Sequence, residues 1–276
     1  MPLKLAYNTN GFAHHSLDST LEVLAELGYE GVAIALDVHH LNPYEVSVRE
    51  LLSLRRRLES LGLDVVIETG ARFLLDSRRK HYPGLLSAEG SERRVHFLVR
   101  ALEIASELGA SVVTFASGVL EPDVSPEDAF GHLVERSAML AERAAHLGLV
   151  ASFEPEPGFF VETLDQYRRL REAVPGQGFG LTLDLGHVHL IETASIEDCI
   201  REWAGDLRQI HLEDMRRPEH LHLALGEGEM EFPPLMAALA EVGYAGLVTL
   251  ELSRDSHRAP EVAEAAIERL RPLVGA

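Results

Sequence analysis

The sequence predicts a single (β/α)₈ barrel of the α/β class, and two regularities carry that prediction. Helical segments repeatedly end at a glycine and are followed by a short apolar run, as the similar stretches around Gly28 and Gly243 show. Eight such apolar runs alternate with helices along the 276 residues. Alternating strands and helices with short connections form parallel sheets, and eight units close into a barrel more readily than they form an open sheet. We therefore expect one domain over residues 1–276.

The expected strands and helix boundaries can be placed in order along the chain. The strands are 3–8, 32–36, 65–68, 112–115, 150–154, 179–184, 209–213 and 247–251. Glycine tolerates the left-handed conformation that ends many helices, and we expect such junctions at Gly28, Gly62, Gly109, Gly148, Gly176, Gly205 and Gly243. Helices should start after a hydroxyl residue that precedes an acidic or amide side chain by three positions, namely after Ser47, Ser125, Thr163 and Ser195.

An open, doubly wound sheet is the alternative architecture. Such sheets that bind dinucleotides carry Gly-x-Gly-x-x-Gly after the first strand. This sequence has no convincing copy there, and Gly226-Glu-Gly228 sits in a polar loop instead. The barrel is therefore the better interpretation.

Composition and charge narrow the class of partner. The chain is 46% hydrophobic and 25% charged, and no apolar run approaches the roughly 18 residues of a membrane span, so we expect no membrane partner. The first residues lack the apolar core of a secretory signal and Cys199 is the single cysteine, which favours a cytoplasmic location. Acidic residues outnumber basic ones by 44 to 25, giving −19, so nucleic acid is not favoured and a small-molecule substrate is expected. Homo-oligomerisation is left open.

Ionisable residues end four successive strands in the C-terminal half. In a (β/α)₈ barrel the C-terminal strand ends form the active face. Three carboxylates and one imidazole converging there would be costly without a cation, and their oxygen and nitrogen atoms suit Mn²⁺, Zn²⁺, Co²⁺ or Mg²⁺. One such residue alone would more often be a surface or hydrogen-bonded group, but four at matching positions favour a metal. The predicted ligands are Glu154, Asp184, His211 and Glu251.

Two motifs beside these strand ends are the most specific features of the sequence. One is Asp184-Leu-Gly-His187, and the other joins His211-Leu-Glu-Asp214 to His222-Leu-Ala-Leu-Gly226-Glu-Gly228. With them the chain resembles, over nearly its whole length, the xylose isomerase-like TIM-barrel superfamily. That superfamily contains sugar and sugar-phosphate isomerases, ketose 3-epimerases, some dehydratases and metal-dependent apurinic endonucleases. The resemblance implies that the four predicted ligands match the shared metal positions.

The same resemblance implies a role for His187 but leaves the substrate open. His187 matches a residue that touches substrate in epimerases and a further metal in endonucleases. After Glu154 the Pro-Glu-Pro-Gly run differs from the Asn-Arg-type continuation of ketose epimerases. The endonuclease branch has an aspartate two residues before the histidine that matches His222, whereas this chain has His220. His220 and His222 would point the same way in an extended segment and could hold a metal, or they could form a solvated loop.

The N-terminal half offers candidate substrate contacts. Glu68 ends the third expected strand and Arg72 follows it, so a carboxylate could orient a hydroxyl and a guanidinium an anionic group. A structural ion pair between them is an equal alternative. With His187 and His222 they complete the expected substrate-binding set. Asn10 and His81 are also polar residues of the N-terminal half, and we assign no function to them from the sequence.

The resemblance implies isomerisation or epimerisation of a small polyhydroxylated carbonyl compound, a sugar or sugar phosphate. A divalent cation would polarise carbonyl and hydroxyl oxygens and stabilise an enediolate-like intermediate. Glu154 and Glu251 would double as metal ligands and as the acid/base pair. Phosphate on the substrate is left open, because the available cations form no recognised phosphate motif: Arg72, Lys80, Arg216 and Arg217.

Two other functions stay open. Metal-dependent phosphodiester cleavage at abasic DNA is supported by His187, His211 and His222, and it is opposed by the net charge of −19 and by His220. A non-catalytic metal-binding barrel in a biosynthetic assembly is the second, since fold does not fix activity.

Overall fold

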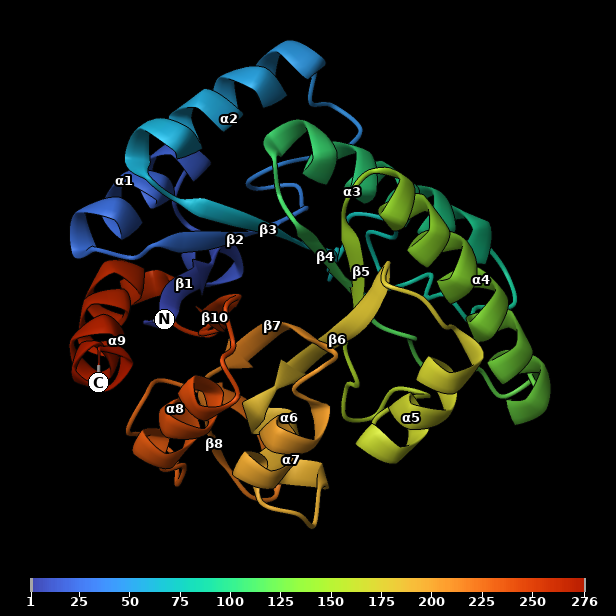
Figure 1. The fold of residues 1–276 in the computed structure, drawn as a ribbon. Coiled ribbons are helices and arrows are strands. Elements are labelled where there is room, and N and C mark those ends of the chain that lie inside the picture. Colours follow the sequence, from blue (N-terminus) through green and yellow to red (C-terminus); the bar gives the residue numbers. More distant parts are fainter. Residues whose placement is uncertain (1, 276) are drawn as a thin grey trace. The chain divides into compact units, whose positions relative to one another are not determined.

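The computed structural model describes residues 2–275 and contains the predicted closed barrel of parallel strands (Figure 1). The strand order is β1-β10-β7-β6-β5-β4-β3-β2. These strands are β1 (Lys4–Asn8), β2 (Gly31–Ala35), β3 (Asp64–Glu68), β4 (Val112–Phe115), β5 (Val150–Phe153), β6 (Phe179–Asp184), β7 (Leu207–Leu212) and β10 (Leu247–Leu250). The fold prediction is confirmed.

Two further strands form an antiparallel hairpin outside the barrel order. They are β8 (Asp214–Arg216) and β9 (Glu219–Leu223), paired in a register that places Asp214 opposite Leu223. The expected strand 209–213 extends one residue too far, because β7 ends at Leu212 and the hairpin begins at Asp214. His220 and His222 lie in β9, so the segment that carries them is extended.

Helices follow the barrel strands, and all four expected hydroxyl starts are confirmed. Ser125 and Ser195 accept hydrogen bonds from the backbone three residues on, while Thr163 with Gln166 and Ser47 with Glu50 cap reciprocally. The helices are α1 (Leu17–Leu27), α2 (Val48–Leu61), α3 (Ser91–Leu108), α4 (Pro126–His146), α5 (Leu164–Ala173), α6 (Leu185–Ile191), α7 (Ile196–Trp203), α8 (Phe232–Glu241) and α9 (Ala259–Val274). Among residues 2–275, none is both long enough and apolar enough to cross a membrane.

Six of the seven expected glycine junctions adopt positive φ, and Gly205 is the exception. At Gly28 the left-handed residue caps α1 and its N–H bonds to Ala25 O, as expected. The expectation for Gly205 is wrong. There α7 ends at Trp203 and is capped by Ala204 in a right-handed conformation, and the Asp206 N–H donates to Trp203 O, so a helical turn closes the junction without a left-handed residue.

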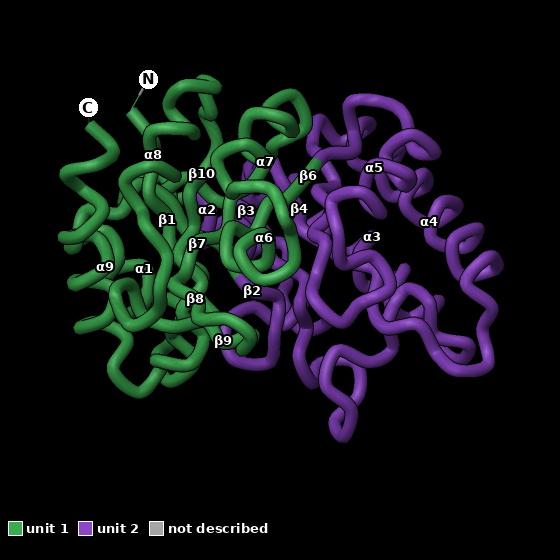
Figure 2. Tube along the Cα trace, turned by 90° about the horizontal axis from the view of Figure 1, so that it is seen from below, with its two compact units in different colours: residues 1–34, 56–65, 181–276 green, residues 35–55, 66–180 purple. Residues whose placement is uncertain are grey.

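The chain divides into two compact units (Figure 2). Unit 1 comprises Met1–Ile34, Arg56–Val65 and Leu181–Ala276, and unit 2 comprises Ala35–Arg55 and Val66–Gly180. The candidate residues are shared between these units. A single domain over residues 1–276 stays a prediction.

In unit 1, strand register aligns the ends of β6, β7 and β10. Asp184 is opposite His211 and His211 is opposite Thr249. The strands are buried apolar runs, with Leu183, Ile210 and Val248 at most 1% exposed, as expected for parallel strands covered on both faces. This packing and register fix the positions of the polar residues at the ends of these strands.

In unit 2, an aromatic cluster supports β4 and β5. The rings of Phe115 and Phe153 meet edge to face with centroids 5.3 Å apart, and Tyr167 and Phe179 lie about Phe153 with centroids 6.0 and 6.2 Å from it. Glu154 follows directly after Phe153, and its backbone N–H donates to Phe115 O. The cluster therefore fixes the backbone from which the Glu154 side chain projects.

Candidate functional site

Three of the four predicted metal ligands converge in unit 1. Asp184 ends β6, His211 lies near the end of β7, and Glu251 directly follows β10. His211 Nδ1 lies 3.2 Å from Glu251 Oε2 and 3.9 Å from Asp184 Oδ2. One ligand atom from each of the three lies within 4.8 Å of the others. Two oxygens and one nitrogen can thus face a single cation.

Hydrogen bonds hold both carboxylates in place. Asp184 Oδ1 accepts from the His187 backbone N–H at 2.8 Å and so caps the start of α6. Glu251 Oε1 accepts from the side-chain amide of Asn10 at 2.6 Å. Asp184 and His211 are only 2% and 1% exposed, so water cannot freely stabilise their charges. Both carboxylates are therefore held by hydrogen bonds, and Asp184 and His211 are shielded from solvent.

The electrostatics of these carboxylates suit a cation. Burial acts to raise the pKa of Asp184, but His187, His222 and His211 outweigh it and hold that pKa below its ordinary value. Burial likewise acts on Glu251, and His211 and His222 lower its pKa. Asp184 Oδ2 is buried without a hydrogen-bond donor. An anionic oxygen with no donor is the kind of group that a metal ion satisfies.

Glu213 is a buried acid that the sequence interpretation missed. It lies between β7 and β8, is 0% exposed, and packs so closely on Gly186 that any Cβ there would collide with it. Burial, followed by the negative charge of Asp184, raises its pKa well above the ordinary value. Among the described residues, both carboxylate oxygens of Glu213 are buried without a hydrogen-bond partner. Burial and the nearby charge of Asp184 thus both disfavour the ionised form of Glu213.

A cluster of three histidines occupies the same unit. His187 Nε2 lies 2.9 Å from His220 Nε2, and one ring nitrogen from each of His187, His220 and His222 lies within 4.8 Å of the others. His222 Nδ1 lies 3.0 Å from the carbonyl oxygen of Glu251 and donates to it. Burial lowers the pKa of His187 to about 4, so its ring is neutral near pH 7. The predicted substrate contacts His187 and His222 therefore meet.

Asp214 explains the second sequence motif. Its carboxylate accepts from the backbone N–H groups of Gly226, Gly228 and Met230 at 2.7, 2.9 and 3.0 Å. A Cβ at Gly228 would collide with Asp214, which accounts for glycine at that position. Asp214 therefore fastens the loop after β9 to the start of the hairpin.

The other predicted residues lie in unit 2. Glu154 follows β5, and Glu68 ends β3, where it is 6% exposed and accepts a hydrogen bond from the Thr114 hydroxyl. Arg72 lies in the loop after β3 and is half-buried. The roles expected of Glu68 and Arg72, as substrate contacts or as a structural ion pair, stay predictions.

Two residues without an assigned role fix the loop that carries Arg72. The buried Arg94 donates to the carbonyl oxygens of Thr69, His81 and Pro83 at 2.8 to 3.0 Å. His81, at φ 59°, bonds through Nδ1 to Gly70 O and through its backbone N–H to Arg72 O. Burial lowers the pKa of Arg94 to about 10 and that of His81 to about 4. Hydrogen bonds from Arg94 and His81 therefore hold the backbone of this loop on both sides of Arg72.

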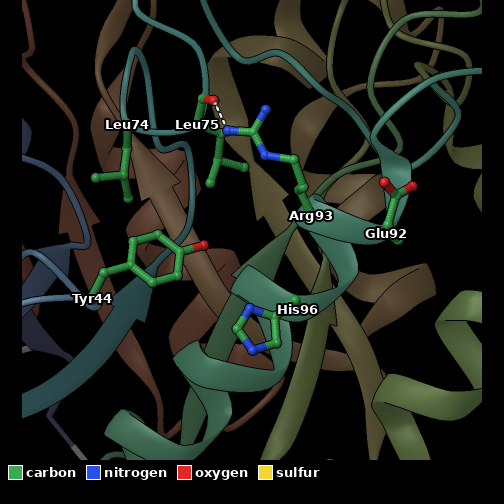
Figure 3. Close-up of a pocket in the computed structure, with 6 residues that line it drawn as sticks. All are labelled: Tyr44, Leu74, Leu75, Glu92, Arg93 and His96. Atoms are coloured by element: carbon green, nitrogen blue, oxygen red, sulfur yellow. Dashed lines mark hydrogen bonds between the residues drawn. The ribbon is translucent and has the colours of Figure 1, made fainter.

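Unit 2 also contains a pocket of about 440 Å³ (Figure 3). Its lining residues are Tyr44, Leu74, Leu75, Glu92, Arg93 and His96. The rings of Tyr44 and His96 stack with centroids 6.4 Å apart, and the Arg93 guanidinium donates to Leu75 O. None of the predicted metal or substrate residues is among the residues that line this pocket.

Comparison with known proteins supplies the family context. The xylose isomerase-like TIM barrel family matches residues 21–273. The 3-dehydroshikimate dehydratase of Pseudomonas aeruginosa is 27% identical over 94% of this chain, which spans only 39% of that protein. The fructoselysine 3-epimerase of Escherichia coli O157:H7 is 21% identical, with 99% of this chain and 98% of the epimerase covered.

Solved structures agree on the fold. An L-ribulose 3-epimerase structure has a TM-score of 0.79 at 20% identity and covers 99% of this chain and 94% of its own. A structure of the IolI protein with a bound zinc atom has a TM-score of 0.76 at 16% identity and covers 99% and 100%. At 20% and 16% identity these structures show that the fold is shared, and they do not show that the reaction is shared.

Proposed function

Because the chain belongs to the xylose isomerase-like TIM barrel family, we propose that it is a divalent-metal-dependent isomerase or epimerase of a small polyhydroxylated carbonyl compound. It is an enzyme of a family whose relatives include sugar epimerases and dehydratases. The observation that carries the proposal is the convergence of Asp184, His211 and Glu251 in unit 1.

The donor set supports a metal of intermediate hardness. Carboxylate oxygens and one imidazole nitrogen suit Mn²⁺, Co²⁺, Zn²⁺ or Mg²⁺. The donorless Asp184 Oδ2 gives a buried anion for the cation to neutralise. We include Glu154 as the fourth ligand, because it follows the strand beside β6 in the barrel order and strand ends of such a barrel share one face.

The chain's own residues would carry the proton transfer. A bound divalent cation supplies polarisation of the substrate's carbonyl and hydroxyl oxygens, which makes the neighbouring C–H more acidic. Glu154 and Glu251 would then remove a proton and return one from the opposite face. The Asn10 amide occupies one oxygen of Glu251 and leaves Oε2 toward His211. His187 would position a substrate oxygen.

The remaining predicted contacts would set substrate preference. His222 belongs to the histidine cluster of unit 1, and Glu68 and Arg72 lie at and after the end of β3 in unit 2. Glu68 is already hydrogen-bonded to Thr114, which holds its carboxylate in one orientation. A guanidinium at Arg72 would favour a substrate with a carboxylate or phosphate. Whether that group is present is decided by the substrate screen.

The test is a screen of metal-loaded protein against ketopentoses, ketohexoses and their phosphates, followed by NMR of the products. We expect metal-dependent inversion or carbonyl migration that is lost in His211→Ala and kept in His189→Ala. His189 is a matched control because its imidazole pairs with Glu229 instead of joining the ligands. Tight metal binding without turnover on the whole panel would favour a non-catalytic barrel, and release of water in place of inversion would favour a dehydratase.

A further inference from the structure

We propose that the pocket beside α3 in unit 2 binds a small aromatic carboxylate, at a ligand site that contains none of the predicted metal or substrate residues. The pocket measures about 440 Å³, within the range of roughly 300–1,000 Å³ that is usual for small-molecule sites. Its lining includes two leucines, two flat rings and one guanidinium (Figure 3). All its lining residues belong to unit 2, and the proposal does not depend on the proposed reaction.

The first turns of α3 and the loop after β3 form one half of the pocket. Arg93 and His96 are three positions apart on α3 and therefore lie on one face of that helix. The Arg93 guanidinium donates to Leu75 O, so helix and loop are joined beside the pocket (Figure 3). Leu75 is only 4% exposed and Leu74 is half-buried, which gives this half an apolar wall. Such a wall favours a ligand with a hydrocarbon body.

The connection from β2 to α2 supplies the other half. Arg100 Nε on α3 donates to Pro43 O at 3.2 Å, and the Asn42 side chain accepts from the Tyr44 backbone N–H at 3.1 Å. These bonds hold Tyr44 beside α3, where its ring and that of His96 are inclined by only 14° with centroids 6.4 Å apart. Two nearly parallel rings present flat faces on which a planar ring can stack. The pair therefore favours an aromatic ligand over an aliphatic one.

The charges beside these rings favour an anion. Within residues 2–275 the guanidinium of Arg93 makes its one hydrogen bond to Leu75 O, which leaves further N–H groups for a ligand. Burial raises the pKa of the Tyr44 hydroxyl, and the positive charges of Arg93 and Arg94 act in the opposite direction. The two guanidinium groups thus place a positive potential at this hydroxyl. A carboxylate in the pocket accepts charge-assisted hydrogen bonds from Arg93.

Glu92 limits the charge of the ligand. It is the one carboxylate among the residues that line the pocket, and Figure 3 shows it beyond Arg93, on the side away from Tyr44. A single guanidinium with a carboxylate nearby balances one negative charge. The second charge of a dianion such as phosphate would be repelled by Glu92. The ligand is therefore a monoanion with a flat, apolar body.

An open groove that only water fills is the competing explanation. The experiment is to titrate the chelator-treated, full-length protein with para-fluorobenzoate and to follow the fluorine NMR signal of this probe. We expect saturable binding that is about 10- to 100-fold weaker in Arg93→Met, because a hydrogen bond to a charged group is lost. Arg143→Met is the matched control, since Arg143 pairs with Glu103 on the surface of the same unit, and it should bind like the wild type. No saturable binding by the wild type, or equal affinity in Arg93→Met, would overturn the proposal.

A second set of measurements separates the ring from the charge. Tyr44 is 48% exposed, so Tyr44→Ala should fold normally and bind para-fluorobenzoate about 3- to 10-fold more weakly. Para-fluorobenzamide has the ring without the charge and phosphate has the charge without the ring, so each should compete at least about 10-fold less well than benzoate. Unchanged binding by Tyr44→Ala, or equal competition by phosphate, would contradict an aromatic site.

A last variant distinguishes this pocket from the proposed metal site. His211 belongs to unit 1 and does not line the pocket, so His211→Ala should bind para-fluorobenzoate like the wild type whether or not the proposed reaction is found. Loss of binding in His211→Ala with binding kept in Arg93→Met would place the probe at the metal ligands and overturn the proposal. Far-UV circular dichroism of each variant confirms that its fold is intact.

Discussion

The side-chain amide of Asn10 donates a 2.6 Å hydrogen bond to Glu251 Oε1, joining two residues that are 241 positions apart in the chain. The bond occupies one carboxylate oxygen and leaves Oε2 3.2 Å from His211 Nδ1. Asn10 thereby sets the orientation of a proposed metal ligand without being one. It comes from the turn that follows β1, and Glu251 comes from the end of β10, the strand paired with β1.

Asn10→Ala should weaken metal binding. Loss of an outer contact to a ligating carboxylate typically costs about 10–100-fold in metal affinity, and we expect a loss in that range. The matched control is Asn42→Ala, since the Asn42 side chain accepts from the Tyr44 backbone N–H in an exposed turn. Calorimetric titration with Mn²⁺ measures both. An affinity for Asn10→Ala within twofold of the wild type would show that Glu251 needs no such support.

His81 should make the protein sensitive to acid. Burial lowers its pKa from 6.5 to about 4, so between these pH values the unfolded chain takes up a proton that the folded chain refuses. The buried, neutral His81 therefore lets the folded protein keep its full stability above pH 6.5, and the free energy of unfolding decreases as the pH falls from 6.5 toward 4. Since one pKa unit corresponds to about 1.4 kcal/mol, the loss is up to about 3 kcal/mol.

The variant His81→Asn isolates this effect. Asparagine tolerates positive φ and can still donate to Gly70 O, but it does not titrate in this range. Urea unfolding at pH 7 and pH 4.5 should show a smaller pH-dependent loss in His81→Asn than in the wild type. His132→Asn, on α4, serves as the control and should follow the wild type. Equal losses in all three proteins would rule out a buried neutral His81.

Replacing Arg94 should destabilise the protein more than replacing an exposed arginine. Arg94 is 7% exposed and its guanidinium donates to three backbone carbonyl oxygens, which lose these donors in Arg94→Met. We expect a loss of about 2–4 kcal/mol in the free energy of unfolding. The exposed Arg57, paired with Glu22, is the control, and Arg57→Met should change stability by less than about 0.5 kcal/mol. Similar small losses in both variants would mean that the loop after β3 does not need the hydrogen bonds of Arg94.

Abasic duplex DNA should bind poorly at physiological salt. The chain's net charge of −19 offers no general attraction to phosphates, and counterion release cannot favour an acidic surface. The assay is cleavage of an abasic duplex with added Zn²⁺ or Mn²⁺. Robust incision by the wild type, absent in Glu251→Gln, would reverse the preference for a small carbohydrate.

Much of the fold could be predicted because the barrel repeats one local signal. Apolar runs such as 112–115 and 179–184 coincide with β4 and β6, and the hydroxyl caps define helix starts. The hairpin β8–β9 could not be predicted with equal clarity. Its second strand is Glu-His-Leu-His-Leu, and the exposed and half-buried pattern of that strand lacks a buried face. The hairpin is defined by Asp214 binding the backbone of the loop beyond it, which no local periodicity reveals.

The sequence allowed us to predict the site residues that lie at the ends of strands. It did not reveal those whose position depends on contacts with residues far away in the chain. Asp184, His211 and Glu251 were identifiable because register brings strand ends together. Glu213 was not, because its burial depends on Gly186, and Arg94 looks like an ordinary charged residue of α3. A glycine two residues after Asp184 was the available signal for Glu213. The convergence of Glu154 with the other ligands stays a prediction.

Solvent-deuterium exchange at the carbon beside the substrate carbonyl tests the central claim most directly. Metal-loaded protein is incubated in D₂O with the ketose found by the screen, and wild type, Glu154→Gln and Glu251→Gln are compared for metal content and for deuterium incorporated. We predict one deuterium at the reacting carbon in the wild type and at least about 100-fold slower exchange in each variant, because each loses a proton-transfer group. If both variants keep their metal and exchange at wild-type rates, the two glutamates do not move the proton.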